Sequence, residues 1–305
     1  MPVQFKTIQF DDKYTFDLVH KGRETLLVTI GDSWTWGHGI STTEWDDGVV
    51  IESDSEKHKR LQSVFGTLIA NKIDADFLNL SYPGQSNGWI AEYFDKFIEH
   101  FRLKMDYKKV IVIITMSEVG REWLGEFDPP VDYYEFCSDI TSIDDFFAKQ
   151  SEKISNKIII TQKKIVDYGL PIQTIKAVGF VEDNYPQGFI DCAKTWQEVL
   201  CEESGTPYEK YGLYLCQTLV VEKLEYLMEY NHNTFDNTGK IKKQSPSLSR
   251  EVYQEQRLSL IDKIDKFNDL IYNSKTNTWR SKEDRGHPSA EGHKIWANYL
   301  IEQIN

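Results

Sequence analysis

The chain has 305 residues and a formal net charge of −13, and 40% of its residues are hydrophobic. This length suits one large α/β domain or two smaller domains. The acidic balance disfavours nonspecific binding to nucleic-acid phosphates or to anionic lipid. Aromatic residues make up 13% of the chain, which is typical of a globular protein and excludes an intrinsically disordered one.

No targeting or metal-binding pattern stands out in the sequence. No window approaches the roughly 18 consecutive apolar residues of a transmembrane helix, and charged residues interrupt the apolar ones near the amino terminus, unlike in a signal peptide. The four cysteines are isolated from one another: Cys137, Cys192, Cys201 and Cys216. We therefore expect a cytoplasmic protein with reduced thiols, no membrane partner, no metal and no other cofactor.

Three strands and two helices alternate in the first part of the chain. Apolar runs at residues 25–30, 75–80 and 109–116 predict buried strands. Apolar residues at helical spacing predict helices over 55–72 and 89–103. The order strand–helix–strand–helix–strand indicates an α/β fold with a parallel sheet and right-handed crossovers.

The second part of the chain is less regular. Residues 173–181 predict a fourth strand, and helical patterns cover 154–168, 213–230, 258–272 and 289–304. Residues 183–250 mix proline, glycine and acidic residues around one good helix, and we interpret them as a mostly helical insertion into the core.

A serine motif, Gly31-Asp32-Ser33, directly follows the first predicted strand. Ligands of open α/β sheets bind beyond the carboxyl ends of the strands, so a serine at this place faces the usual crevice. The alternative is structural, because aspartate and serine commonly cap a turn or the start of a helix.

A second motif, Asp284-Arg285-Gly286-His287, precedes the last predicted helix. A serine hydroxyl becomes a good nucleophile when a base accepts its proton, and a carboxylate can orient that base. An aspartate three residues before a histidine on a turn can supply both groups, although such a pair alone is more often a polar surface feature.

Together these motifs resemble those of the SGNH hydrolases, also called GDSL hydrolases. The matching residues are Gly31-Asp32-Ser33 after the first strand, Gly84 after the second, and Asp284-x-x-His287 before the last helix. The resemblance implies a three-layer α/β/α fold with a flavodoxin-like parallel sheet of about five strands. It also implies that Ser33 is the nucleophile, His287 the general base and Asp284 its orienting partner, with an oxyanion hole that uses the N–H groups of Ser33 and Gly84.

The third motif of that family is altered here. The family places an asparagine after the third strand as a further oxyanion donor, whereas this chain has Ser117 followed by Glu118. Ser117, Asn87 or Arg121 are the candidate replacements. The altered pattern is similar to that of SGNH-like proteins of tailed phages and environmental sequences.

A rival serine and two tryptophans are further candidate site residues. Ser86 lies in Gly84-Gln85-Ser86-Asn87-Gly88, which matches the G-x-S-x-G nucleophile elbow, but this interpretation leaves the Gly31-Asp32-Ser33 motif unexplained. Trp34, Trp36 and Arg121 are the candidate substrate-binding residues. The two tryptophans follow Ser33 and could stack on a sugar ring, with ordinary packing as the alternative.

The sequence thus predicts a serine esterase that hydrolyses small acyl esters, with O-acetylated carbohydrate as the substrate class that the resemblance favours. The alternative is a catalytically silent SGNH-like module that binds a glycan or a protein, as a component of a virion or another protein assembly; transfer of the acyl group to a sugar is a third option. No motif supports a nucleic-acid partner. Because Ser33 and His287 lie near opposite ends, we expect residues 1–305 to form one domain, with 1–24 as an extension and about 183–250 as an insertion.

Overall fold

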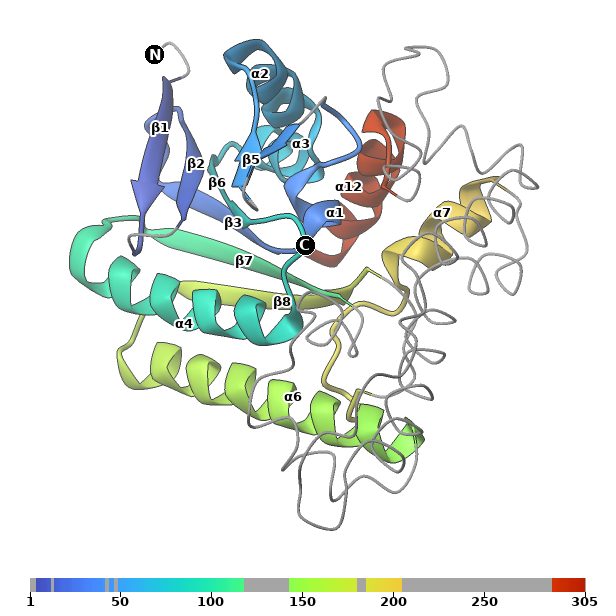
Figure 1. The fold of residues 1–305 in the computed structure, drawn as a ribbon. Helices are drawn as coiled ribbons and strands as arrows, with labels where there is room; N and C mark the ends of the chain where they lie inside the picture. The colour runs from blue at the N-terminus through green and yellow to red at the C-terminus, as the bar shows by residue number, and fades with distance from the viewer. Residues whose placement is uncertain are drawn as a thin grey trace, which may run out of the picture.

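The computed structural model describes residues 4–11, 14–41, 44–46, 49–117, 143–179, 185–204 and 287–304. Six strands of this part form one sheet in the order β1-β2-β6-β3-β7-β8 (Figure 1). Their bounds are Gln4–Gln9 (β1), Thr15–His20 (β2), Thr25–Gly31 (β3), Asp76–Ser81 (β6), Lys109–Met116 (β7) and Ile172–Val178 (β8). Two short strands, β4 (Glu44–Asp46) and β5 (Val49–Ile51), pair separately.

The core of the sheet is parallel, as predicted. β3 pairs in parallel with β6 on one side and with β7 on the other, and β7 pairs in parallel with β8. Ile30 near the end of β3 lies beside Leu80 of β6 and Ile114 of β7, so the carboxyl ends of the three strands meet at one edge. The loops that follow these strands are therefore neighbours.

The amino-terminal segment, predicted as an extension, contributes two strands at one edge of the sheet. β1 and β2 form an antiparallel hairpin, and β2 pairs antiparallel with β6. The described sheet thus contains four parallel strands and an antiparallel pair, where about five parallel strands were expected. Phe16 and Leu18 of β2 are buried, but the charged residues around them obscure the strand pattern in the sequence.

Helices cover both faces of the sheet and give the predicted three-layer α/β/α fold (Figure 1). Leu26 and Val28 of β3 pack toward α4 and α6, whereas Leu27 packs toward α3, α7 and α12. The alternation follows from the opposite directions of successive side chains in a strand. The helix bounds are Ser33–Trp36 (α1), Asp54–Ser63 (α2), Phe65–Lys72 (α3), Asn87–Lys104 (α4), Ile143–Asp167 (α6), Trp196–Ser204 (α7) and Ala290–Ile304 (α12).

The predicted helix over residues 55–72 is two helices, α2 and α3. Val64 separates them with an extended backbone (φ −66°, ψ 142°). A Cβ atom on Gly66 would overlap the ring of Phe77 in β6, so α3 lies directly against the sheet there. The helical spacing of apolar residues continues through the break, which is why the sequence does not reveal it. The predicted helices 213–230 and 258–272 lie outside the described residues.

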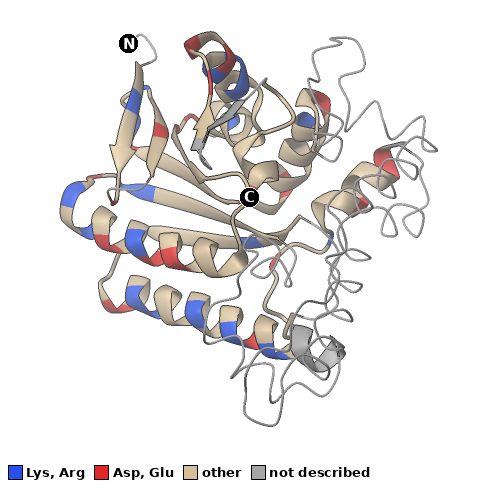
Figure 2. Ribbon diagram, viewed as in Figure 1, with Lys and Arg blue, Asp and Glu red and all other residues tan. Residues whose placement is uncertain are grey.

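The described helices carry charges of both signs, and a few charged residues, Asp32, Arg60 and Asp76 among them, are buried. Figure 2 shows Lys and Arg interspersed with Asp and Glu along α4 and α6, whereas the central strands carry few charged residues. Within the described part of the chain, every helix is too short or too polar to cross a bilayer.

A buried carboxylate closes the opposite edge of the sheet, where β6 begins. Asp76 accepts hydrogen bonds from the N–H groups of Lys21 (2.7 Å) and Arg23 (3.2 Å) and from the Tyr107 hydroxyl (3.0 Å). His20 Nδ1 lies 2.6 Å from the same carboxylate. Burial opposes ionisation of Asp76, but these hydrogen bonds outweigh it and hold its pKa below the ordinary value.

This arrangement predicts that Asp76 contributes to stability at neutral pH. A lowered folded-state pKa stabilises the fold above the unfolded-state value of about 3.9, and the contribution is lost as the pH falls through the folded-state pKa. Asp76→Asn should cost about 1–3 kcal/mol at pH 7 and should flatten the acid limb of the stability curve in urea unfolding. The control Asp74→Asn changes an exposed neighbour and should leave both unchanged. Equal acid limbs for wild type and Asp76→Asn would contradict the prediction.

Candidate active site

Ser33 occupies a sharp turn at the carboxyl end of the central strand β3. It is the first residue of α1, and the Asp32 carboxylate caps this helix by accepting the Trp34 N–H at 3.0 Å. A Cβ atom on Gly31 would overlap the Thr35 hydroxyl, so only glycine permits the helix to follow the strand this closely. Ser33 is 3% exposed. The turn thus fixes the serine at the edge where the parallel strands end.

His287 lies against Ser33, although 254 residues separate them in the sequence. The distance from His287 Nε2 to Ser33 Oγ is 2.9 Å, within the range for a nucleophile that donates its proton to a base. His287 is half-buried and lies just before α12. The structure therefore brings together the serine and the histidine of the two sequence motifs. Asp284 lies outside the described residues, so its role stays a prediction.

The packing of α12 holds His287 in place. His293 on α12 is fully buried and accepts the Phe65 N–H of α3 at 3.3 Å through Nδ1. Trp296 of α12 stacks on Trp196 of α7 with ring centroids 5.4 Å apart. Burial lowers the pKa of His293 to about 3, so its imidazole is neutral in the folded protein at pH 7.

A turn that follows α1 packs against His287. The His38 ring lies 4.5 Å from the His287 ring, centroid to centroid. A Cβ atom on Gly39 would overlap the Pro288 carbonyl oxygen and would lie 3.0 Å from His287 Cβ. Neither His38 nor Gly39 belongs to a recognised motif, so the sequence does not predict these contacts with His287 and Pro288.

The loop of Gly84 lies beside the turn of Ser33. β3 and β6 end together, with Gly31 opposite Ser81, and the Tyr82 N–H donates to the Gly31 carbonyl at 3.3 Å. Gly84 is exposed and has φ +79°, and no atom lies within 4 Å of the place where its Cβ would be. The two backbone N–H groups predicted for the oxyanion hole thus come from adjacent loops.

The proposed third oxyanion donors are both used within the fold. The Ser117 hydroxyl donates to the Asp32 carboxylate at 2.8 Å. The Asn87 amide donates to the Ser117 carbonyl (2.9 Å) and to the Tyr185 hydroxyl (3.1 Å), and its oxygen accepts the Ser117 N–H (2.7 Å). These bonds occupy the hydroxyl proton and both amide protons, which counts against Ser117 or Asn87 as the third donor; that role stays a prediction. Arg121 lies outside the described residues.

The tryptophans after Ser33 are interior residues. Trp34 is 2% exposed and packs edge-on against Trp196, with ring centroids 5.4 Å apart. Trp36 is 7% exposed and lies under the Arg60 guanidinium, 3.7 Å from Cζ to the ring centroid. Neither ring has the open face that stacking on a sugar requires, so the packing alternative replaces their prediction as substrate-binding residues.

The rival serine has a structural contact. Ser86 is the N-cap of α4, and its hydroxyl accepts the Trp89 N–H at 3.3 Å. This is the role that serine commonly has at the start of a helix. Among the described residues, no group of three or more His, Cys, Asp or Glu side chains is placed to hold a metal ion.

No protein-family model matches the sequence, and no curated protein matches it. Among solved structures, the chain is similar to a carbohydrate esterase whose active site has divergent catalytic and non-catalytic binding functions, at 14% identity and TM-score 0.40, over 98% of this chain and 74% of that one. It is similar to a lipolytic protein of the G-D-S-L family from Desulfitobacterium hafniense DCB-2, at 12% identity and TM-score 0.34, over 91% and 98% of the two chains. A family two carbohydrate esterase from Clostridium thermocellum, in complex with cellohexaose, matches at 13% identity and TM-score 0.33, over 94% and 65%. At these identities and TM-scores, the likenesses fix neither the activity nor the substrate of this chain.

The burial of His293 predicts a pH-dependent anchor for the site. The unfolded chain takes up a proton on this histidine below about pH 6.5, whereas the folded protein resists protonation down to about pH 3. Stability from this group is therefore complete above pH 6.5 and is lost as the pH falls toward 3. His293→Asn, which keeps an acceptor for the Phe65 N–H, should lower stability at pH 7 but weaken its pH dependence between pH 6.5 and 4.

Urea unfolding of the two proteins across this pH range checks the prediction. The matched control is His58→Asn, which replaces an exposed histidine on α2. For this control we expect the free energy of unfolding to depend on pH as it does in the wild type. If the free energy of unfolding of His293→Asn falls with pH as steeply as that of the wild type, the lowered pKa is not a property of His293.

Proposed function

We propose that the protein is a serine ester hydrolase of SGNH type, with Ser33 as nucleophile and His287 as general base. The 2.9 Å contact between Ser33 Oγ and His287 Nε2 carries this proposal. The contact is placed at the carboxyl edge of a parallel sheet, where α/β proteins bind their ligands. The resemblance of the sequence motifs to SGNH hydrolases supports the same assignment.

The reaction follows from the positions of the two side chains. His287 Nε2 takes the proton of Ser33 as its oxygen attacks the ester carbonyl. The tetrahedral intermediate collapses, the protonated His287 gives its proton to the departing alcohol oxygen, and the acyl group remains on Ser33. Water then attacks the acyl-enzyme with His287 again accepting a proton, and the carboxylic acid leaves while the proton returns to Ser33. Asp284 would orient His287 and stabilise the imidazolium.

Backbone groups would stabilise the developing oxyanion. The N–H of Ser33 belongs to the first residue of α1, where helical N–H groups have no partner within the helix. The N–H of Gly84 lies on the adjacent exposed loop. Because the Ser117 hydroxyl and the Asn87 amide are used elsewhere, we expect an oxyanion hole with two donors. Relative to a hole with three donors, this should lower kcat by about 10²- to 10³-fold.

The surroundings of Ser33 favour a small acyl group. Ser33 is 3% exposed, and a short acyl group is the one that most easily reaches an oxygen buried to this degree. The net charge of −13 disfavours a polyanionic substrate. We propose a short acyl ester, with O-acetylated carbohydrate as the first class to test because the motif resemblance implies it.

The internal use of Ser117 and Asn87 also favours a second candidate, a catalytically silent module of the same fold that binds a glycan or a protein. A serine and a histidine within hydrogen-bonding distance would have no required role in such a module. The two candidates differ in whether Ser33 becomes acylated.

Removing the nucleophile tests the main proposal. Ser33→Ala should lower kcat on p-nitrophenyl acetate by about 10⁴-fold or more and abolish labelling by a fluorophosphonate, measured by intact mass. Ser86→Ala removes the rival serine and should keep both activity and labelling. Full activity in Ser33→Ala would overturn the assignment, and absence of labelling in the folded wild type would favour the silent module.

Replacing the acid of the second motif tests the rest of the triad. Asp284→Asn should lower kcat by about 10⁴-fold, because the asparagine favours the wrong tautomer of the histidine. Glu283→Gln, at the adjacent residue, is the matched control and should leave kcat unchanged. If the two variants behave alike, Asp284 does not orient His287.

A further inference from the structure

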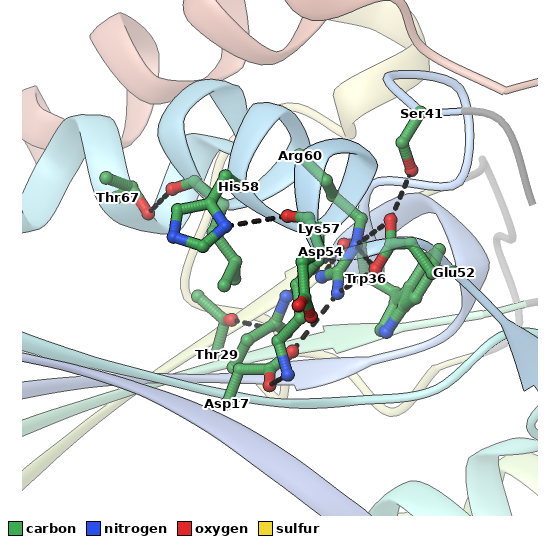
Figure 3. Close-up of polar contacts among 12 residues, drawn as sticks. Asp17, Thr29, Trp36, Ser41, Glu52, Asp54, Lys57, His58, Arg60 and Thr67 are labelled. Atoms are coloured by element: carbon green, nitrogen blue, oxygen red, sulfur yellow. Dashed lines mark hydrogen bonds and ion pairs between the residues drawn. The ribbon is translucent and has the colours of Figure 1, made fainter. Parts of the chain in front are cut away.

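Arg60 on α2 is a buried cation outside the family motifs. It is 1% exposed, and its guanidinium contacts two carboxylates (Figure 3). Nε and Nη2 donate to Glu52 at 2.8–3.1 Å, and Nη2 also donates to Asp17 of β2 at 3.1 Å. Lys57, one turn earlier on α2, pairs with the same Asp17. A buried charge with this many partners has a fixed position.

The Arg60–Glu52 pair holds both ends of the turn 36–41. At the first end, Arg60 Nη1 donates to the Trp36 carbonyl at 3.2 Å, and the guanidinium lies over the Trp36 ring. At the other end, the Ser41 hydroxyl donates to Glu52 Oε1 at 2.6 Å. Figure 3 shows Trp36 and Ser41 reaching the same ion pair from the two ends of this turn.

The middle of the turn contacts the general base of the proposed mechanism. His38 lies against the His287 ring, and Gly39 packs against His287 Cβ and the Pro288 carbonyl. The beginning of the turn is fixed to Ser33 as well, because the Ser33 carbonyl accepts the His38 N–H at 3.0 Å. A shift of the turn would therefore change the distance between His287 and Ser33.

We propose that Arg60 and Glu52 are positioning residues. They fix the turn 36–41, and this turn holds the His287 ring in contact with Ser33. The catalytic part of this inference rests on the function proposed above. A guanidinium is required because one planar group must bind Glu52 through two nitrogens while a third nitrogen reaches the Trp36 carbonyl. A lysine would keep the positive charge but could not make these contacts together.

Arg60→Lys tests the proposal, and Arg102→Lys is the matched control, because Arg102 makes an exposed ion pair with Glu99 on α4. In Arg60→Lys we expect the Ser33 Oγ–His287 Nε2 distance in crystals to exceed 3.2 Å. We also expect kcat on p-nitrophenyl acetate to fall by about 10- to 100-fold, the effect of a displacement near 1 Å, with KM within twofold of the wild type. The control should keep the wild-type distance and kcat.

A folded Arg60→Lys protein with the 2.9 Å contact and the wild-type kcat would overturn the proposal. If Arg60→Lys does not fold, Ser41→Ala decides, because it detaches only the second end of the turn. For Ser41→Ala we expect a longer Ser33 Oγ–His287 Nε2 distance and a kcat reduced by about three- to tenfold, a smaller effect than that of a full displacement. An unchanged distance and an unchanged kcat would overturn the proposal. If the wild type hydrolyses no ester, the proposed function fails, while the distances in the crystals still decide whether Arg60 positions His287.

Discussion

The buried carboxylate of Asp32 determines how the carboxyl edge of the sheet is built. A polar group in the interior is costly unless it is hydrogen-bonded, and Asp32 accepts hydrogen bonds from the Trp34 N–H and the Ser117 hydroxyl. Ser117 is itself held by the Asn87 amide. This chain of contacts ties the loop after β3 to the loops after β7 and β6, and Ser33 is the residue next to its starting point. The same contacts that fix the turn of Ser33 also occupy the Ser117 hydroxyl and the Asn87 amide.

Much of the fold could be predicted because strong local signals agree with it. The parallel strands are apolar runs followed by glycine or polar residues, and the helices between them have clear periodicity. Two features were missed for physical reasons. The helix break at Val64 is followed by the close approach of Gly66 to the sheet, a tertiary contact, and the helical spacing continues through it. The β1–β2 hairpin contains charged side chains such as Asp17, whose partner Arg60 lies 43 residues away.

The sequence predicts some features of the candidate site and not others. The serine and histidine were found because their spacing and flanking elements are set by the chemistry that such a pair would perform. The roles of Trp34, Trp36, Ser117 and Asn87 were not, because residue type alone does not say whether a side chain faces solvent or an internal partner. The sequence contains one indication that Arg60 is buried. It lies four residues before Val64, on the apolar face of the predicted helix, where a charged residue requires a buried partner.

The separation of 254 residues between Ser33 and His287 has a consequence for how the chain acquires its site. Contacts between distant parts of a chain form slowly, since a large loop must close before they contribute. In a nascent chain, Ser33 and the sheet around it emerge from the ribosome long before α12. Until α12 docks on α3 and α7, His287 is not held beside Ser33, and a serine hydroxyl without a base is a poor nucleophile. Under the proposed function, an incompletely folded molecule is therefore not acylated at Ser33, and the serine becomes reactive only when the last helix has been incorporated.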